Sequence, residues 1–131
     1  MVLESRYELV RFIGAGGMGE VYEARHREIG RRVAIKFLLP RYAERADLVA
    51  RFENEASAAG TLEHENIVAV IDVGVAPDGA RYLVMEFLQG EDGAVLLGRT
   101  GALSVARATS IVSQVCRGLS PRMRTASFTA I

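Results

Sequence analysis

The chain has 131 residues, half of them apolar, and its 16 lysines and arginines balance 16 aspartates and glutamates. That length suits one domain or part of one, and the apolar share is large enough for a buried core. The formal net charge of zero argues against a chain-wide electrostatic attraction to nucleic acid or to an anionic membrane.

Two segments rich in strand-forming residues, 7–13 and 20–26, flank a glycine-rich loop. The loop at 14–19 reads GAGGMG and holds four of the thirteen glycines of the chain. Each glycine adds conformational entropy to the unfolded chain, so this density indicates a backbone that must come very close to another group. The sequence therefore predicts a hairpin whose turn approaches a ligand.

A third strand is predicted at 33–38, where the side chains alternate in character. The alternation puts Ala34 and Lys36 on one face of this strand and Val33 and Ile35 on the other. We expect the three strands to form an antiparallel meander in which a small residue and a cation share a face.

The spacing of Leu48, Phe52 and Ala56 then predicts a helix over residues 47–62. Two further strand-like segments are joined by the turn sequence APDG, and helical patterns follow them. The last helix has Ser104 as its expected N-cap. In chain order these later elements are strands at 67–75 and 80–88, a short helix near 92–98 and a helix over 104–119.

Two kinds of nucleotide site share the G-x-G-x-x-G spacing of Gly14, Gly16 and Gly19. In a dinucleotide-binding dehydrogenase the glycines open a helix, and an acidic residue follows about twenty positions later. Here a strand follows the glycines, and the residue seventeen positions after Gly19 is Lys36. A glycine loop between strands can donate backbone N–H groups to phosphates, and a lysine on the next strand adds positive charge. The pattern therefore favours phosphate binding between strands over the dehydrogenase interpretation.

The three glycines and Val21, followed by the sequence VAIK at 33–36, resemble the N-terminal lobe of a protein kinase. The segments RFENEA, LEHENIV and YLVMEFLQGEDG resemble bacterial Ser/Thr kinases, and the resemblance covers residues 7–119. It implies an α+β fold with a five-stranded antiparallel sheet and one packed helix, followed by two C-lobe helices. The implied division is an ATP-binding N-lobe at 1–88, the hinge exit and first C-lobe helices at 89–119, and an aberrant tail at 120–131.

The resemblance also implies roles for individual residues toward ATP. Lys36 would position the phosphates, and a glutamate of the helix would hold its amine in place. Glu53 and Glu55 lie about 200° apart around a helix, so only one can face the sheet, and the family pattern assigns Glu55. Met85 would lie behind the adenine. The residues expected to contact ATP are Ile13, Gly14, Ala15, Gly16, Gly17, Met18, Gly19, Val21, Ala34, Lys36, Met85 and, at the hinge, Glu86 and Leu88.

The motifs that carry catalysis in the family do not occur in these residues. A kinase continues into a His-Arg-Asp loop, which supplies the base, and a later Asp-Phe-Gly, which binds magnesium. Neither motif occurs in the 131 residues. We therefore expect ATP binding, no protein ligands for a metal, and weak or absent catalysis. The alternatives are a non-catalytic module that binds a nucleotide or a partner, and a product without function.

The segment 120–131 fits neither a continued helix nor a catalytic loop. With suitable synonymous codons for these residues, a shifted reading frame encodes the missing His-Arg-Asp signature. The hypothesis is that one base was lost near Ser120 in an ancestral gene.

Compartment and partners follow from composition and from the resemblance. Cys116 is the only cysteine, so an internal disulfide is impossible and we expect a reducing cytoplasm. No segment reaches the roughly 18 uninterrupted apolar residues of a membrane helix. The expected partners are ATP and a protein substrate, with neither nucleic acid nor a membrane.

Overall fold

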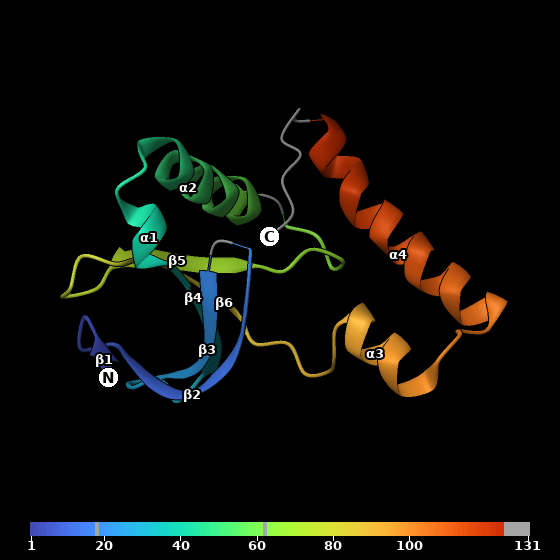
Figure 1. The fold of residues 1–131 in the computed structure, drawn as a ribbon, viewed down its shortest axis with the longest axis horizontal. Coiled ribbons are helices and arrows are strands. Elements are labelled where there is room, and N and C mark those ends of the chain that lie inside the picture. The colour runs from blue at the N-terminus through green and yellow to red at the C-terminus, as the bar shows by residue number, and fades with distance from the viewer. Residues whose placement is uncertain (18, 62, 125–131) are drawn as a thin grey trace.

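A six-stranded antiparallel sheet dominates the computed structural model, which describes residues 1–17, 19–61 and 63–124 (Figure 1). Neighbouring strands pair in the order β1-β2-β3-β4-β6-β5. Hairpin connections account for most neighbours, and α2 lies between β4 and β5 in the chain. The strands are β1 (Val2–Leu3), β2 (Tyr7–Gly16), β3 (Gly19–His26), β4 (Arg32–Leu38), β5 (Val70–Val75) and β6 (Arg81–Glu86).

The α+β class is confirmed, but the prediction of five strands misses β1. This two-residue strand pairs with the start of β2, with Leu3 opposite Tyr7. The turn between them places Glu4 and Ser5 at φ values of 46° and 60°. Positive φ values are uncommon at residues other than glycine. Because this turn contains no glycine, nothing in the sequence marks it. A strand of two residues is also too short to show alternation.

Four helices complete the described part of the chain. The short helix α1 starts at Pro40, which the sequence indicates only as the end of a strand. In α4, the Ser104 side chain accepts a hydrogen bond from the Arg107 N–H at 3.2 Å, so the predicted cap is confirmed. The helices are α1 (Pro40–Ala43), α2 (Ala46–Thr61), α3 (Gly93–Thr100) and α4 (Val105–Arg124).

The end of α4 differs from the prediction for the tail. The helix continues to Arg124, so residues 120–124 are helical where the sequence pattern suggested otherwise. Residues 125–131 lie outside the described residues. Among the helices that the structure describes, none is long and apolar enough to cross a membrane.

Each face of the sheet carries its own apolar cluster. Helix α2 covers one face (Figure 1), and the cluster beneath it consists of Ala34, Leu38, Phe52, Ala56, Leu83 and Met85. The opposite face carries Leu3, Tyr7, Ala24, Val33, Ile35, Ala76, Tyr82 and Val84. The alternation predicted for residues 33–36 is therefore confirmed, because Ala34 and Val33 belong to different clusters. Helices α3 and α4 lie to one side of the sheet and follow the extended segment after β6.

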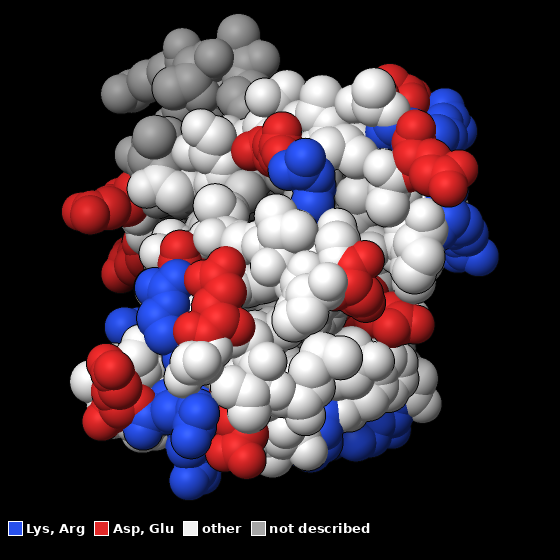
Figure 2. All heavy atoms as spheres, turned by 90° about the vertical axis from the view of Figure 1, so that its left-hand side faces the viewer, with Lys and Arg blue, Asp and Glu red and all other residues white. Residues whose placement is uncertain are grey.

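Charged side chains of both signs are mixed on the surface. Figure 2 shows acidic and basic groups next to one another in several places on one face of the molecule. Individual pairs explain this mixing, such as Arg6 with Glu4 at 2.7 Å and Arg45 with Asp47 at 2.9 Å. Such a surface agrees with the balanced composition and gives no large field of one sign on that face.

Candidate functional site

The glycine-rich segment forms the tip of the β2–β3 hairpin. Gly16 pairs with Gly19 at its end, and Gly17 has a φ of 59°, a conformation that glycine adopts without steric cost. A Cβ atom added to Gly14 or Gly16 would have nothing within 4 Å. These two glycines are therefore not required by packing, and the space beside them is open to a ligand. Met18 lies outside the described residues.

Gly19 and Lys36 are packed against each other. A Cβ atom on Gly19 would lie 2.9 Å from Cε of Lys36 and 2.7 Å from the carbonyl oxygen of Phe37. The aliphatic stem of the lysine thus runs along the backbone of the hairpin, and only glycine leaves room for it. The third glycine of the motif has a structural cause that the first two lack.

Three of the residues predicted to contact ATP lie together on the α2 face of the sheet. Strand register sets Val21 opposite Lys36, and Ala34 opposite Met85. Ala34 and Met85 are each 8% exposed, and Val21 packs against the same cluster. Ile13 differs, because it lies at a register shift in β2 and is 45% exposed. The structure brings the first three together and leaves Ile13 at the open side.

The two glutamates of α2 differ in the way that the helical geometry predicts. Glu55 is only 4% exposed, whereas Glu53 lies at the surface and forms an ion pair with Arg81. The choice of Glu55 as the residue facing the sheet agrees with this burial. Lys36 is half-buried, and it makes no hydrogen bond or ion pair with any residue that the structure describes. A Lys36–Glu55 pair therefore stays a prediction.

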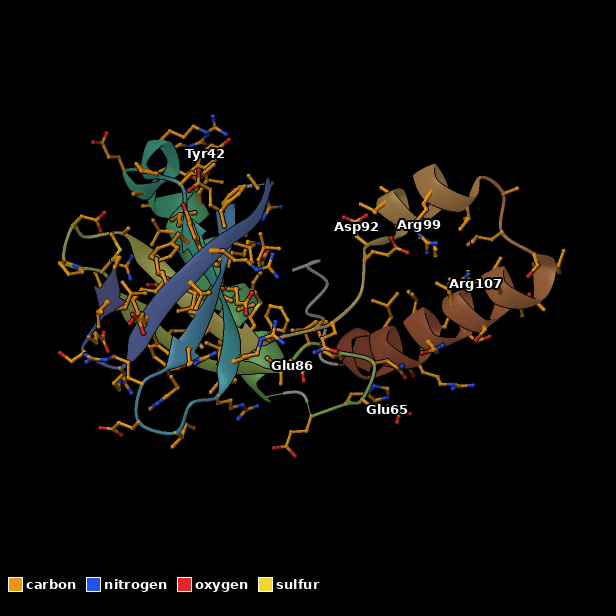
Figure 3. The ribbon with its side chains drawn as sticks, turned by 90° about the horizontal axis from the view of Figure 1, so that it is seen from below. Tyr42, Glu65, Glu86, Asp92, Arg99 and Arg107 are labelled. Carbon is orange, nitrogen blue, oxygen red and sulfur yellow. The ribbon has the colours of Figure 1, made fainter. Side chains whose placement is uncertain are left out.

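The segment after β6 is the predicted hinge. Glu86 closes the strand, and its N–H and carboxylate bond the carbonyl and N–H of Ala69 at 3.0 Å and 2.9 Å. Two residues later, Leu88 is 59% exposed, and its backbone makes no hydrogen bond with a described residue. Figure 3 places Glu86 where the sheet meets the segment leading to α3. An exposed, unpaired backbone at this point can pair with the edge of a flat base.

Three charged side chains beside the hinge residue Phe87 were not predicted as part of the site. Glu23 is 7% exposed and accepts hydrogen bonds from Arg11 at 2.6 Å and Arg32 at 2.9 Å. The Arg32 guanidinium also lies over the Phe87 ring, 4.1 Å from its centroid. Burial alone would raise the pKa of Glu23, but the hydrogen bonds from Arg32 and Arg11 outweigh it and lower that pKa. The signal in the sequence was the parity of β3, which puts Glu23 on the same face as Val21.

The described residues do not fit a magnesium site of their own. No group of three or more His, Cys, Asp or Glu side chains among them could hold a metal ion. His64 has a structural role in its loop, because its Nδ1 accepts a hydrogen bond from the Asn66 N–H at 3.0 Å.

The comparison with protein families agrees with the glycine hairpin, the lysine and the sheet. The model of the protein kinase domain matches residues 7–121. The chain belongs to this family.

Several curated bacterial proteins are similar to the chain. Pkn1 of Myxococcus xanthus, named a serine/threonine-protein kinase, is 44% identical over 86% of this chain, which spans 16% of that protein. A probable serine/threonine-protein kinase of Clostridium perfringens is 39% identical over 90% of this chain, which spans 17% of it. PknA of Mycobacterium tuberculosis is 38% identical over 91% of this chain, which spans 28% of it. The chain thus corresponds to a minor part of each relative.

Solved structures agree with the sequence relatives. The crystal structure of the Mycobacterium tuberculosis PknI kinase domain superimposes with a TM-score of 0.77 at 31% identity. The match covers 91% of this chain and 47% of that kinase domain. The kinase-like fold is therefore confirmed.

Proposed function

We propose that these residues form the ATP-binding lobe of a Ser/Thr protein kinase. The observation that carries the proposal is the packing of the Lys36 stem along Gly19, on the strand face that also holds Val21 and Ala34. This arrangement sets one cation beside an open glycine backbone and next to apolar side chains. It suits a ligand with phosphates at one end and a flat base at the other.

Each part of the site has a distinct role in this proposal. The base lies against Val21 and Ala34, with Met85 behind it, and pairs with backbone groups at Glu86 and Leu88. The phosphates accept hydrogen bonds from the hairpin backbone and a charge contact from Lys36. Glu55 holds the amine of Lys36 once the ligand is bound. The hairpin residues, including Ala15 and Gly17, cover the phosphates and exclude water.

The reaction of the family is transfer of the γ-phosphoryl group of ATP to a serine or threonine hydroxyl of a protein. The hydroxyl attacks the γ-phosphorus, its proton passes to a base, and ADP leaves. These residues supply positioning for that reaction but neither the base nor metal ligands. We expect the 131-residue chain alone to show weak or absent transfer, because catalysis here depends on positioning together with charge stabilisation. Magnesium-dependent labelling of a protein by this chain, abolished by Lys36→Met, would contradict the expectation.

A second candidate function is a non-catalytic module that binds a nucleotide or a partner. It would use the same open glycine hairpin and apolar face for binding alone. The cytoplasm remains the proposed compartment, because the single Cys116 is an exposed free thiol and such thiols are kept reduced there.

Calorimetric titration with ATP and with adenosine tests the site. Ala34→Trp should abolish binding of both ligands, because the ring fills the space against which the base lies. Lys36→Ala removes one charge contact worth about 1 kcal/mol, so ATP should weaken roughly five- to ten-fold while adenosine changes little. Equal losses for ATP and adenosine in Lys36→Ala would show that the lysine is structural. No binding of either ligand to the unaltered chain would reject the nucleotide site.

A further inference from the structure

The hinge residue Phe87 is held against the sheet by one arginine. Arg32 is the first residue of β4, and its guanidinium carbon lies 4.1 Å from the centroid of the Phe87 ring. Phe87 is half-buried and packs against the cluster beneath α2. It stands between Glu86 and Leu88, the two residues whose backbone is proposed to pair with adenine. A cation over an aromatic ring at this distance is attractive, and more so with a guanidinium, which also stacks.

Arg32 is itself fixed by a buried acid. Its Nε donates to one oxygen of Glu23 at 2.9 Å, and Arg11 donates to the other oxygen at 2.6 Å. The Glu23 side chain is only 10% exposed, so its position is set by the strands around it. In the strand register Glu23 lies opposite both Arg11 and Ala34. The contacts of Glu23 with Arg32 and of Arg32 with Phe87 thus connect the strand position opposite Ala34 to the hinge.

We propose that Arg32 is a positioning residue for nucleotide binding: held by Glu23, it clamps Phe87 and so fixes the backbone of the hinge at 86–88. The inference rests on the proposed nucleotide site and adds a residue to it. Arg32 does not touch the ligand in this proposal. It acts by restricting the hinge before the base arrives, which reduces the ordering cost of binding.

Arg11 provides a matched control. It carries the same charge and donates to the same carboxylate, but its guanidinium does not lie over the Phe87 ring in the described structure. Its side chain is 61% exposed, against 42% for Arg32. Arg11→Ala therefore removes a cation and one hydrogen bond to Glu23 while leaving the clamp in place. Any difference between Arg32→Ala and Arg11→Ala reports the contact with the hinge.

The first measurement is amide hydrogen exchange of the full chain without ligand. We expect the amide of Glu86, whose N–H donates to the Ala69 carbonyl at 3.0 Å, to exchange several-fold faster in Arg32→Ala than in the unaltered chain, with Arg11→Ala unchanged. Arg32→Lys, which keeps a cation near the ring, should restore part of the protection. Equal exchange in Arg32→Ala and Arg11→Ala would overturn the clamp, whether or not a nucleotide binds.

The second measurement is the affinity for adenosine and for ATP. Arg32→Ala should weaken both by the same factor, about three-fold, because the hinge contacts the base and the loss is that of one cation–π contact. The double variant with Arg32→Ala and Phe87→Leu should bind little more weakly than either single variant, since both substitutions remove the same contact. Unchanged affinity, or additive losses, would overturn the positioning role. If the unaltered chain binds neither ligand, the proposed function and the positioning role both fail, while faster exchange in Arg32→Ala would still establish the clamp itself.

Discussion

The sheet with α2 and the pair α3–α4 are built differently, although one chain forms both. The sheet carries an apolar cluster on each face, and several of its side chains are fully buried. Among the described side chains of α3 and α4, Leu96 is the only buried apolar one. Three apolar side chains of α4 are exposed, namely Ile111, Val112 and Val115, by 38%, 58% and 52%.

This difference indicates which region contributes most to the free energy of unfolding of the described structure. Contact between α4 and the rest occurs near Asn66, whose carbonyl oxygen would lie 2.8 Å from a Cβ on Gly118. Figure 3 shows Glu65, in the same loop, beside α4. Buried polar residues follow the same division, since Glu23 and Glu55 belong to the sheet and α2. We infer that the sheet and α2 hold the fold together, while α3 and α4 depend on what covers their apolar faces.

The largest expected effect comes from a comparison of one apolar side chain from each region. Leu83→Ala empties a site that is 0% exposed between the sheet and α2, so unfolding by urea should lose about 2–5 kcal/mol. Val115→Ser, at an exposed position of α4, should change stability by less than about 0.5 kcal/mol. It should also reduce self-association in sedimentation experiments, because the apolar patch shrinks. Similar losses of stability in the two variants would break the comparison.

A second test asks whether tight packing extends into the glycine hairpin. Gly19→Ala puts a methyl group 2.7 Å from the Phe37 carbonyl oxygen, so stability should fall by about 1–3 kcal/mol. Gly16→Ala is the control, because its Cβ would meet no atom within 4 Å. Its stability should stay equal or rise by up to about 1 kcal/mol, since alanine restricts the unfolded chain. ATP affinity should nevertheless fall in Gly16→Ala, because the open space there is the proposed place of the phosphates.

Local periodicity predicted most of this fold, and the failures have local causes. The face shared by Ala34 and Lys36 followed from the two-residue repeat of a strand. Helix geometry indicated that only one of Glu53 and Glu55 faces the sheet, and the resemblance to the family chose Glu55. Strand β1 was missed because it has two residues and a turn without glycine. Helix α1 was missed because its first residue, Pro40, ends strands as readily as it begins helices.

The candidate site was only partly predictable for a different reason. The glycine hairpin and Lys36 carry a motif with fixed spacing, so the sequence alone indicates them. The contact of Arg32 with Phe87 joins positions 55 residues apart, and no motif connects the two residues. A charged residue on a core face, as Glu23 is, was the only local signal. Long-range pairs of this kind need the strand register, which no single sequence supplies.

A third, smaller effect should appear in acid. Because hydrogen bonds from Arg32 and Arg11 lower the pKa of Glu23 below its ordinary value of 4.5, its ionised form stabilises the fold at neutral pH. That contribution is present above pH 4.5 and is lost as the pH falls through the lowered pKa. Glu23→Gln should therefore be less stable than the unaltered chain at pH 7, and the difference should narrow in acid. Urea unfolding at pH 7 and pH 3 measures this.

The control for this test lies in the other region. Glu91, two residues before α3, forms an ion pair at the surface with Arg99 of that helix. Exposed ion pairs contribute little, so Glu91→Gln should change stability much less than Glu23→Gln at pH 7. A larger loss in Glu91→Gln would contradict the view that the sheet region carries the stability of the chain.

The smallest effect concerns Tyr82, on the other face of the sheet. Its hydroxyl is buried, and it makes no hydrogen bond with a described residue. Burial, together with the negative charge of Glu4, raises its pKa from 10.0 to about 12. The folded protein therefore keeps this proton at pH values where the unfolded chain loses it. Stability that is constant below pH 10 should fall as the pH rises from 10 to about 12.

Tyr82→Phe isolates this contribution, because it removes the titrating group and keeps the aromatic ring, whose centroid lies 5.8 Å from that of Phe37. At pH 7 the substitution should change the unfolding free energy by less than about 1 kcal/mol, since the hydroxyl has no partner to lose. Between pH 10 and 12 the variant should lose less stability than the unaltered chain, and absorbance at alkaline pH should show one late-titrating tyrosine fewer. Tyr7 and Tyr22 also have raised pKa values, so the measured quantity is the difference between the two proteins. Parallel pH profiles would mean that Tyr82 titrates like an exposed tyrosine, and the cluster on this face would then be less closed to water than the one beneath α2.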